Sequence, residues 1–280
     1  MMRLFGGMAA CITALLTAGS AFALCAPVAD APRPRAWPAV ELPAQLPPKG
    51  SVEITYVGHS TFLIRTPAGV SAATDYNDHI RPPVTPTIAT MNRAHSTHFS
   101  YAPDPAIKHV LPGWKEGGVA EHNLVERDMK VFNIPTNIRN WESRTTDYGG
   151  NSIFVFEAGG LCIAHLGHLH HTLTPEHLKR MGPIDIVMIA VDGTVTLTQE
   201  GALEVVEQIK PKVVIPMHFF SEVTRERFVA LFAGRYPTRR SESPTVIYSR
   251  ANLPDRELIV LPGIEAYSAP AGRIHLPLTP

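Results

Sequence analysis

Histidine is the residue type in this chain that is best suited to chemistry. The 280-residue sequence contains 13 histidines, and histidine is both the commonest metal ligand in proteins and the side chain that titrates nearest neutral pH. Eight of them lie in four short segments, each directly after a run of apolar and β-branched residues. These eight are His59, His95, His98, His165, His168, His170, His171 and His218. If the four segments meet in space, they could form a metal site or an acid–base site.

The four segments carry unequal weight when each is taken alone. The pair His95 and His98, spaced as His-x-x-His, is more typical of solvated or hydrogen-bonded histidines than of metal ligands. His218 alone would be interpreted as a hydrogen-bonded histidine at a strand end. Residues 165–171 read HLGHLHH, and four imidazoles in seven residues are hard to explain by packing. The joint placement at strand ends favours a functional role, because sites in layered α/β folds gather in the loops there.

The elements that would position these segments are strands and helices in alternation. Apolar runs predict strands, the Ala158-Gly159-Gly160 break predicts a hairpin, and Thr174-Pro175-Glu176 is typical of a helix start. The predicted strands cover residues 52–57, 61–66, 70–74, 88–91, 107–111, 129–134, 152–157, 161–165, 184–191, 212–216, 245–249 and 257–261, and the predicted helices cover 174–182, 198–210 and 221–233. Early hairpins, and helices between the later strands, indicate a mixed α/β layered fold.

The first 50 residues are predicted to lie outside the folded domain. A cationic start, an apolar run and the pattern Ala21-Phe22-Ala23 predict a signal peptide over residues 1–23, whereas a transmembrane span would need a longer apolar run. Residues 24–50 are rich in proline and predict a surface leader or tether. Residues 51–280 then form one domain, periplasmic or secreted, with no stable membrane anchor. A disulfide between Cys25 and Cys162 is compatible with that compartment but is not indicated.

The overall composition excludes several classes of protein. The chain has 25 basic and 25 acidic residues, and 45% of its residues are hydrophobic. Zero formal net charge gives no electrostatic basis for binding nucleic acid, and the apolar fraction is that of a folded chain rather than a disordered one. We therefore expect a folded protein without a nucleic-acid partner. The sequence predicts no particular oligomeric state.

Four segments, in order along the chain, resemble the metallo-β-lactamase superfamily. They are residues 54–64 (ITYVGHSTFLI) with Asp75 after them, 150–155 (GNSIFV), 163–167 (IAHLG) and 216–219 (PMHF). The branch that they resemble most contains ascorbate-6-phosphate lactonase-like and N-acylphosphatidylethanolamine phospholipase D-like proteins. The resemblance implies an α/β fold, an αββα sandwich of mixed sheets with outer helices. It also implies a site for one or two metal ions, usually zinc, at one edge of the sheets.

The signature of this superfamily, His-x-His-x-Asp-His, is altered in the chain. In the register that fits best it falls on residues 93–98, where Arg93 replaces the first histidine and Thr97 replaces the aspartate. His168 stands where the family has a bridging aspartate, and residues 140–142 contain no counterpart of a further family histidine. The resemblance therefore does not carry over a two-metal site.

Two interpretations of the altered signature are open. In the first, the remaining imidazoles rebuild a site for one ion, most simply Zn²⁺, with water in an open position. The ligands would be His95, His98, His168 and His218. Arg93 would then clamp an anionic part of the substrate or exclude a second metal ion. In the second interpretation, the chain keeps the fold without the chemistry and acts in ligand binding or as a structural or interaction module.

Other polar residues of these segments are expected to support the reaction. Residues expected to hold ligand histidines by hydrogen bonds, rather than to bind metal themselves, are His59, Asp75 and His165. The predicted proton carriers are Asp192, His170 and His171. The favoured function is a secreted metal-dependent hydrolase, in which metal-activated water attacks an ester, lactone, amide or phosphodiester.

Overall fold

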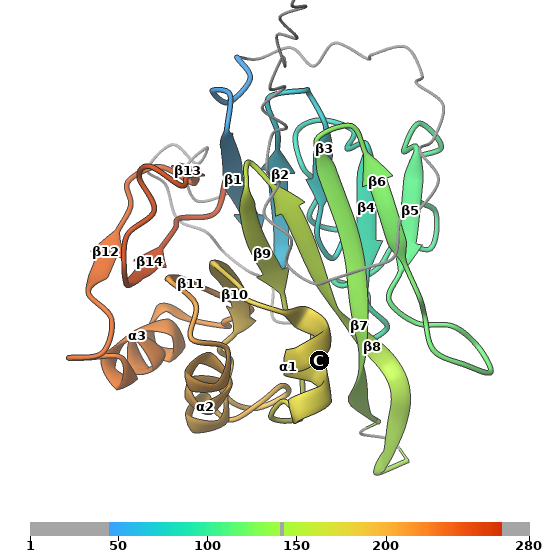
Figure 1. Cartoon of the computed structure of the whole chain (residues 1–280). Helices are drawn as coiled ribbons and strands as arrows, with labels where there is room; N and C mark the ends of the chain where they lie inside the picture. Colours follow the sequence, from blue (N-terminus) through green and yellow to red (C-terminus); the bar gives the residue numbers. More distant parts are fainter. Residues whose placement is uncertain (1–44, 141–142, 265–280) are drawn as a thin grey trace, which may run out of the picture.

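Two β-sheets packed face to face form the centre of the molecule, and helices cover the outer face of one of them (Figure 1). The computed structural model describes residues 45–140 and 143–264. The predicted signal peptide, residues 24–44 of the predicted leader, Cys25 and residues 141–142 lie outside the described residues. The predicted α/β sandwich of mixed sheets with outer helices is confirmed. Within the described ranges, no helix has the length and apolar character that a membrane span requires.

The first sheet has six strands and carries two of the histidine segments. Its strands, from one edge to the other, are β13 (Thr245–Ser249), β1 (Ser51–Gly58), β2 (Thr61–Arg65), β3 (Ser71–Ala73), β4 (Ile88–Met91) and β5 (His109–Pro112). β2 is antiparallel to β1 and β3, and β4 is parallel to β3. β1, β3 and β4 therefore run in one direction, which brings the residues after them to the same edge of the sheet. These residues include His59, Asp75, His95 and His98.

The second sheet has eight strands and carries the other two histidine segments. Its strands, in spatial order, are β12 (Thr238–Arg240), β14 (Glu257–Val260), β11 (Val213–Met217), β10 (Ile186–Ala190), β9 (Leu161–His165), β8 (Thr145–Ala158), β7 (Met129–Asn140) and β6 (Asn123–Glu126). β10 is parallel to both β9 and β11. The segments that follow these three strands therefore leave the sheet at one edge, and they carry His168, Asp192 and His218.

A two-residue turn joins β8 to β9, as the sequence predicts. Ala158 pairs with Leu161 across the turn, and Gly159 and Gly160 have φ angles of +59° and +73°. Glycine adopts this left-handed region without steric cost, and such turns match the twist of the flanking strands. A Cβ atom on Gly159 would also lie 2.6 Å from the carbonyl carbon of Ser51. The turn thus fixes the register of β9.

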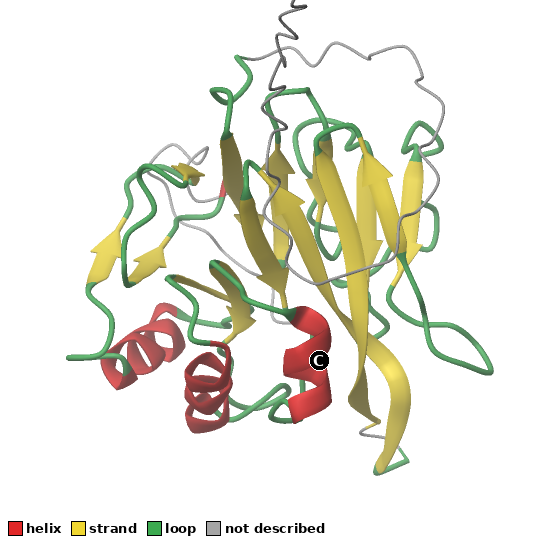
Figure 2. Ribbon diagram, in the orientation of Figure 1, coloured by secondary structure: helices red, strands yellow, loops and turns green. Residues whose placement is uncertain are grey.

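Side-chain caps begin the three helices of the described residues. The helices are α1 (Pro175–Met181), α2 (Gln199–Ile209) and α3 (Glu222–Leu231). The side chains of Thr174, Thr198 and Ser221 accept hydrogen bonds from backbone amides of the first turns. All three helices contribute to the apolar cluster on the outer face of the second sheet (Figure 2). The helix predictions over residues 174–182, 198–210 and 221–233 are confirmed to within two residues at either end.

β10 shows how the second sheet is buried on both faces. Ile186, Met188 and Ala190 belong to the core between the two sheets, whereas Val187 and Ile189 belong to the core under the helices. All five residues are buried, which confirms the prediction from the continuous apolar run at 184–191. The outer face of the first sheet is covered by a third cluster, formed by Ala73, Tyr76, Ala89, Met91 and Ile107.

The strand predictions differ from the structure at the edges of the second sheet. β6 and β12 were not predicted, because most of their side chains are exposed and show no apolar pattern. The strands predicted at 129–134 and 152–157 are longer, since β7 and β8 continue as a paired hairpin to Asn140 and Thr145. This extension lies beyond a register shift between Thr136 and Ile138 and is rich in polar residues. The extension is held by backbone pairing between β7 and β8. Because it has no alternating apolar pattern, the sequence could not indicate it.

Candidate metal site

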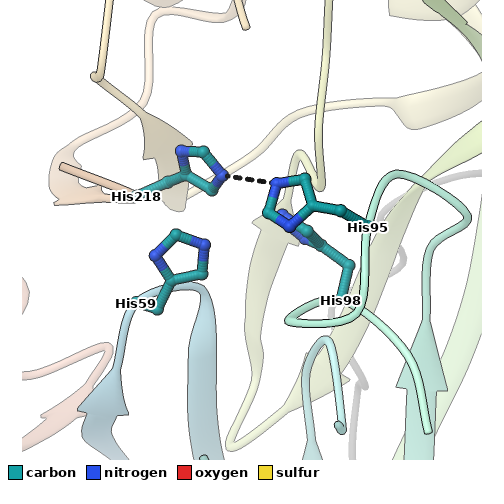
Figure 3. A group of neighbouring side chains, drawn as sticks. All are labelled: His59, His95, His98 and His218. Carbon is teal, nitrogen blue, oxygen red and sulfur yellow. Dashed lines mark hydrogen bonds between the residues drawn. The ribbon is translucent and has the colours of Figure 1, made fainter. Parts of the chain in front are cut away.

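Four histidines meet at the edge where loops of both sheets come together (Figure 3). His59 lies in the β1–β2 turn, His95 and His98 follow β4, and His218 follows β11. One ring nitrogen from each of them lies within 4.8 Å of the others. We call these four residues the histidine cluster. Three loops, distant in sequence, therefore supply one potential metal site.

The rings of the histidine cluster are close enough to share one ion. The Nε2 atoms of His218 and His95 are 3.4 Å apart (Figure 3). Ring centroids are separated by 4.1 Å for His59 and His218, and by 4.4 Å for His95 and His98. No carboxylate belongs to the group, as far as the described residues extend. A donor set made of imidazole nitrogens suits Zn²⁺ and other divalent transition metals.

Two buried carboxylates hold two of the four rings from behind. Oδ2 of Asp75 lies 2.5 Å from Nδ1 of His98, and Oδ2 of Asp192 lies 3.1 Å from Nδ1 of His218. A carboxylate accepts the proton on Nδ1, so the lone pair of each ring resides on Nε2. Both rings are thereby fixed in the tautomer that leaves Nε2 able to bind a metal.

Four imidazole nitrogens at the site are buried and find no hydrogen-bond partner among the described residues. They are the Nε2 atoms of His59, His98 and His168 and the Nδ1 atom of His170. An unpartnered buried polar atom costs about 1–3 kcal/mol, so each such atom requires an explanation. A metal ion held by Nε2 of His59 and of His98 would provide one. The residues present therefore fit a bound metal.

The backbone adopts the left-handed region at three residues of the site. The φ angles are +51° at His59, +41° at Asp75 and +53° at His218, and residues other than glycine adopt such values rarely. The amide of His218 donates to the carbonyl oxygen of His59 at 2.8 Å, which ties the two loops together. Uncommon conformations persist only where the surrounding structure imposes them, and they gather at functional sites. The fold here imposes the contact between His59 and His218.

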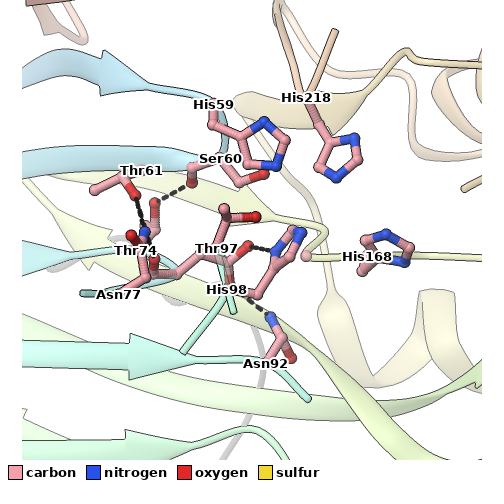
Figure 4. Close-up of polar contacts among 12 residues, drawn as sticks. His59, Ser60, Thr61, Thr74, Asn77, Asn92, Thr97, His98, His168 and His218 are labelled. Carbon is pink, nitrogen blue, oxygen red and sulfur yellow. Dashed lines mark hydrogen bonds and ion pairs between the residues drawn. The ribbon is translucent and has the colours of Figure 1, made fainter. Parts of the chain in front are cut away.

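His168, one of the predicted metal ligands, lies directly beside the histidine cluster (Figure 4). Its ring centroid is 4.9 Å from that of His98 and 5.0 Å from that of His218. Its Nδ1 lies 2.8 Å from Nε2 of His170. The predicted ligand set and the histidine cluster share three members, and His59 takes the fourth place. Metal binding by His168 stays a prediction.

The histidines on either side of His168 are placed differently. His165 is buried behind the cluster, with Nε2 2.8 Å from the carbonyl oxygen of Ser60 and 4.0 Å from Oδ2 of Asp75. His171 lies against the β7–β8 hairpin, where its Nε2 accepts from the amide of Asn137 at 3.2 Å. Its Nδ1 bonds to a backbone carbonyl oxygen. The structure therefore does not bring His171 into the cluster.

Asp192, a predicted proton carrier, is surrounded by hydrogen-bond donors. Its carboxylate faces Nδ1 of His218 and also accepts from the amides of Thr194 and Val195 and from the hydroxyl of Thr196. This arrangement is suited to orienting His218. Proton transfer by Asp192 stays a prediction that these contacts do not favour.

Arg93 and Thr97, which replace two residues of the family signature, lie on the same loop as His95. Arg93 is exposed. The hydroxyl of Thr97 lies 2.8 Å from Nδ1 of His95. Thr97 therefore contacts a cluster histidine through its hydroxyl, although it cannot replace an aspartate as a charged ligand.

Burial lowers the pKa of several histidines at the site. Together with neighbouring histidines it lowers the pKa of His59 to about 2, and it lowers the pKa of His170 to about 4. It also holds the pKa of His98 well below its ordinary value. Burial raises the pKa of Asp75 to about 6, so this carboxyl is still ionised at neutral pH. Neutral imidazole is the form that binds a metal ion.

Two contributors to the site were not identified as such from the sequence. His59 was expected to support a ligand rather than to join the cluster. Its position after a strand, which it shares with the other histidines, was the available signal. Asn92 was not singled out, although its buried amide contacts Asp75. Neither its residue type nor its spacing distinguishes it.

Comparison with known proteins finds relatives described as metal-dependent hydrolases. A UPF0173 metal-dependent hydrolase of Polaromonas sp. is 25% identical over 216 residues, which cover 62% of this chain and 79% of the relative. A UPF0173 metal-dependent hydrolase of Carboxydothermus hydrogenoformans is 32% identical over 74 residues, or 26% of this chain. The second match spans 33% of that relative's length.

A solved structure and a family profile extend the similarity to most of the fold. The structure, from Thermotoga maritima, is described as that of a proposed Zn-dependent hydrolase of the metallo-β-lactamase superfamily. It is 26% identical, has a TM-score of 0.56, and the match covers 75% of this chain and 98% of that chain. The profile of the β-lactamase superfamily domain matches residues 53–218, which is more than half of the chain and includes the histidine cluster. This chain therefore belongs to the metallo-β-lactamase superfamily.

Proposed function

We propose that this chain is a metal-dependent hydrolase whose metal ion is bound by the histidine cluster. The observation that carries the proposal is the convergence of four ligand nitrogens within 4.8 Å. Nε2 of His59 and of His98 find no hydrogen-bond partner in the described parts of the chain, so both nitrogens are able to bind a metal ion. The relatives described as metal-dependent hydrolases support the same activity.

The ion that fits this donor set best is a single Zn²⁺. The ligands would be His59, His95, His98 and His218. When bound, the ion would polarise the scissile bond of a substrate and lower the pKa of a water ligand. A catalytic zinc keeps a position for water or substrate. Solvent would reach such an ion past His95, which is more exposed than His98 or His218.

His168 and His170 form the pair that can move a proton at this site. Nε2 of His168 is buried beside the cluster without a partner among the described residues, and its Nδ1 lies 2.8 Å from Nε2 of His170. A proton accepted at Nε2 of His168 can be matched by release of another from Nδ1 toward His170, which is less buried. General-base catalysis of this kind contributes about 10²–10⁴-fold to a rate.

The substrate in this proposal is a small molecule with an ester, lactone, amide or phosphodiester bond. Arg93 is exposed on the loop that carries His95. Its guanidinium is always charged and matches carboxylate and phosphate groups in geometry. We therefore assign Arg93 to an anionic part of the substrate.

Elemental analysis of variants tests the metal site. The wild-type protein should hold about one ion per chain, and His98→Ala and His218→Ala should each lose it. His79→Ala is the matched control, because His79 is an exposed histidine outside the cluster. A wild-type chain that binds no ion after reconstitution with Zn²⁺, Fe²⁺ or Mn²⁺ would overturn the proposal.

A substrate panel then separates an enzyme from a binding protein. Fluorogenic esters, lactones, amides and phosphodiesters should be hydrolysed in proportion to bound metal, and the activity should disappear with chelation. Stoichiometric metal without turnover of any of these four classes would favour the ligand-binding or structural interpretation of the altered signature.

We also propose that the protein is exported through the predicted signal peptide at residues 1–23. Expression in a Gram-negative host with a C-terminal tag should yield a shortened chain in the periplasmic fraction. Deletion of residues 2–23 should keep the protein in the cytoplasm. A full-length chain in the cytoplasm of the first strain would contradict export.

A further inference from the structure

We propose that Asn92 is a positioning residue that holds the loop of His95 and His98 in place within the histidine cluster. The inference rests on the proposed function, because the cluster must bind a metal for its register to matter. Asn92 follows β4 directly and is fully buried. Figure 4 shows it beside His98. The hydrogen bonds of its side chain go to Asp75 and Ser152 rather than to a cluster histidine, so it acts through other residues.

The side chain of Asn92 joins the two sheets. Its Nδ2 donates to Oδ1 of Asp75 at 2.9 Å, and its Oδ1 accepts from the amide of Ser152 at 2.8 Å. Asp75 lies just after β3 of the first sheet, and its carboxylate contacts Nδ1 of His98. Ser152 lies in β8 of the second sheet. Asn92 therefore fixes the carboxylate that orients His98 against the opposite sheet.

The backbone of Asn92 also contributes to the position of the loop that carries His95 and His98. Its amide donates to the carbonyl oxygen of His98 at 3.0 Å. This bond closes residues 92–98 into a loop that carries both His95 and His98. The two histidines from this loop are therefore tied to Asn92 through a backbone bond as well as through Asp75.

The segment that carries His168, which lies beside the histidine cluster, is packed against the Asn92 amide. A Cβ atom on Gly167 would lie 2.4 Å from Nδ2 of Asn92, and one on Gly113 would lie 2.5 Å from its Oδ1. Both positions must therefore remain glycine for the amide to occupy its place. Gly167 directly precedes His168, so the amide also sets how closely the segment of His168 approaches the cluster.

An amide is the group that this position requires. It must present a donor to Asp75 and an acceptor to the amide of Ser152. Asp at position 92 has the same shape, but would place an oxygen 2.9 Å from Oδ1 of Asp75. Two carboxyl oxygens cannot approach in this way without repulsion or a shared proton. Asn92→Asp should therefore release Asp75 from its contact with His98 without changing the volume of the core.

Zinc affinity in Asn92→Asp tests the inference. A residue that orients a metal ligand contributes about 10–100-fold to metal affinity, so the Kd for Zn²⁺ should rise by that factor. The measurement is competition with a chromophoric chelator on the full-length protein, alongside the thermal unfolding midpoint of the metal-free form. Asn92→Ser serves as a second variant if Asn92→Asp does not fold, since the smaller side chain also cannot bridge Asp75 and Ser152.

Asn133→Asp is the matched control. Asn133 is buried and donates to Oγ of Ser152 and to the carbonyl oxygen of Ala120, both at 2.9 Å, and it accepts from the amide of His122. It contacts the same serine as Asn92, but no residue that holds a cluster histidine. Its substitution should lower the unfolding midpoint and leave the Kd for Zn²⁺ within about twofold of wild type, far from the loss of a positioning residue.

A double-mutant cycle identifies the route of the effect. If Asn92 acts through Asp75, Asn92→Ala should weaken zinc binding in the wild-type background and should change it little in an Asp75→Ala background. Equal shifts in zinc affinity for Asn92→Asp and Asn133→Asp, or an undiminished effect in the Asp75→Ala background, would overturn the inference. If the wild-type protein binds no zinc, the result contradicts the proposed function rather than the role of Asn92.

Discussion

Replacing His59 with asparagine should remove a metal ligand and leave the fold intact. His59 has a φ angle of +51°, and asparagine tolerates this region better than alanine or other residues with a Cβ atom. Nε2 of His59 is buried and unpartnered within the described ranges, so the metal-free protein loses no hydrogen bond at that atom. The substitution therefore separates metal binding from stability.

The expected loss of affinity exceeds that of a residue that only supports a ligand. Supporting residues contribute about 10–100-fold, so His59→Asn should raise the Kd for Zn²⁺ by more than about 100-fold, or about 2.8 kcal/mol. His168→Asn is the matched comparison, because its ring lies 5.0 Å from that of His218 but outside the cluster. Its Kd should change by less than about tenfold, while kcat falls by about 10²–10⁴-fold.

Chelator competition at neutral pH measures both affinities, and hydrolysis at saturating zinc measures kcat. Circular dichroism of the metal-free variants checks that both chains are folded. The opposite pattern, in which His168→Asn loses zinc and His59→Asn retains it, would refute the assignment of His59. That result would restore the ligand set predicted from the sequence, which is His95, His98, His168 and His218.

Further outcomes follow from the same contacts. Asp192→Asn should weaken zinc binding by about 10–100-fold in chelator competition, because it loosens the carboxylate contact with His218; unchanged affinity would contradict that role. His171→Ala should leave zinc affinity and kcat at wild-type values, since this ring bonds to the β7–β8 hairpin instead. Burial lowers the pKa of His98 and His168, so below pH 6.5 the unfolded chain binds protons that the folded chain does not. In urea unfolding of the metal-free protein, the free energy of unfolding should therefore fall by about 1.4 kcal/mol for each such histidine with every unit that the pH is lowered below 6.5. The pKa of Asp75 is raised from 3.8 to about 6, so between these pH values the folded chain binds a proton that the unfolded chain does not. In that range Asp75 increases the free energy of unfolding as the pH falls, and it offsets the effect of one histidine.

The sandwich could be predicted where burial leaves a pattern in the sequence. The run at 184–191 is apolar throughout because β10 is buried between the sheets on one face and under helices on the other. Thr174 and Pro175 mark the start of α1 because capping depends on neighbouring residues alone. β12 is exposed along its length and forms by pairing with β14. Such a strand depends on a distant partner, so local sequence could not indicate it.

The site could be predicted as a set of histidines, but not as a geometry. His170 and His171 are adjacent in the chain, yet one contacts His168 and the other contacts the β7–β8 hairpin. The direction of a loop side chain depends on backbone angles, and His59 and His218 both adopt a left-handed φ that no local rule assigns to histidine. For this reason the sequence singled out His95, His98 and His218 as ligands but could not indicate that the ring of His59 lies beside them.

The two carboxylates behind the histidine cluster explain how a site without an acidic ligand can hold a divalent ion. Neutral imidazoles bring no charge, and a buried charge without compensation is very unfavourable. Asp75 and Asp192 are ionised at neutral pH, since the pKa of Asp75 is about 6 and hydrogen bonds hold that of Asp192 low despite burial. Each lies one hydrogen bond behind a cluster ring, so two negative charges face a doubly charged ion. The chain lacks carboxylates at Thr97 and His168, but it keeps these two negative charges directly behind the histidine cluster. For this reason we favour a rebuilt metal site over a lost one as the interpretation of the altered signature.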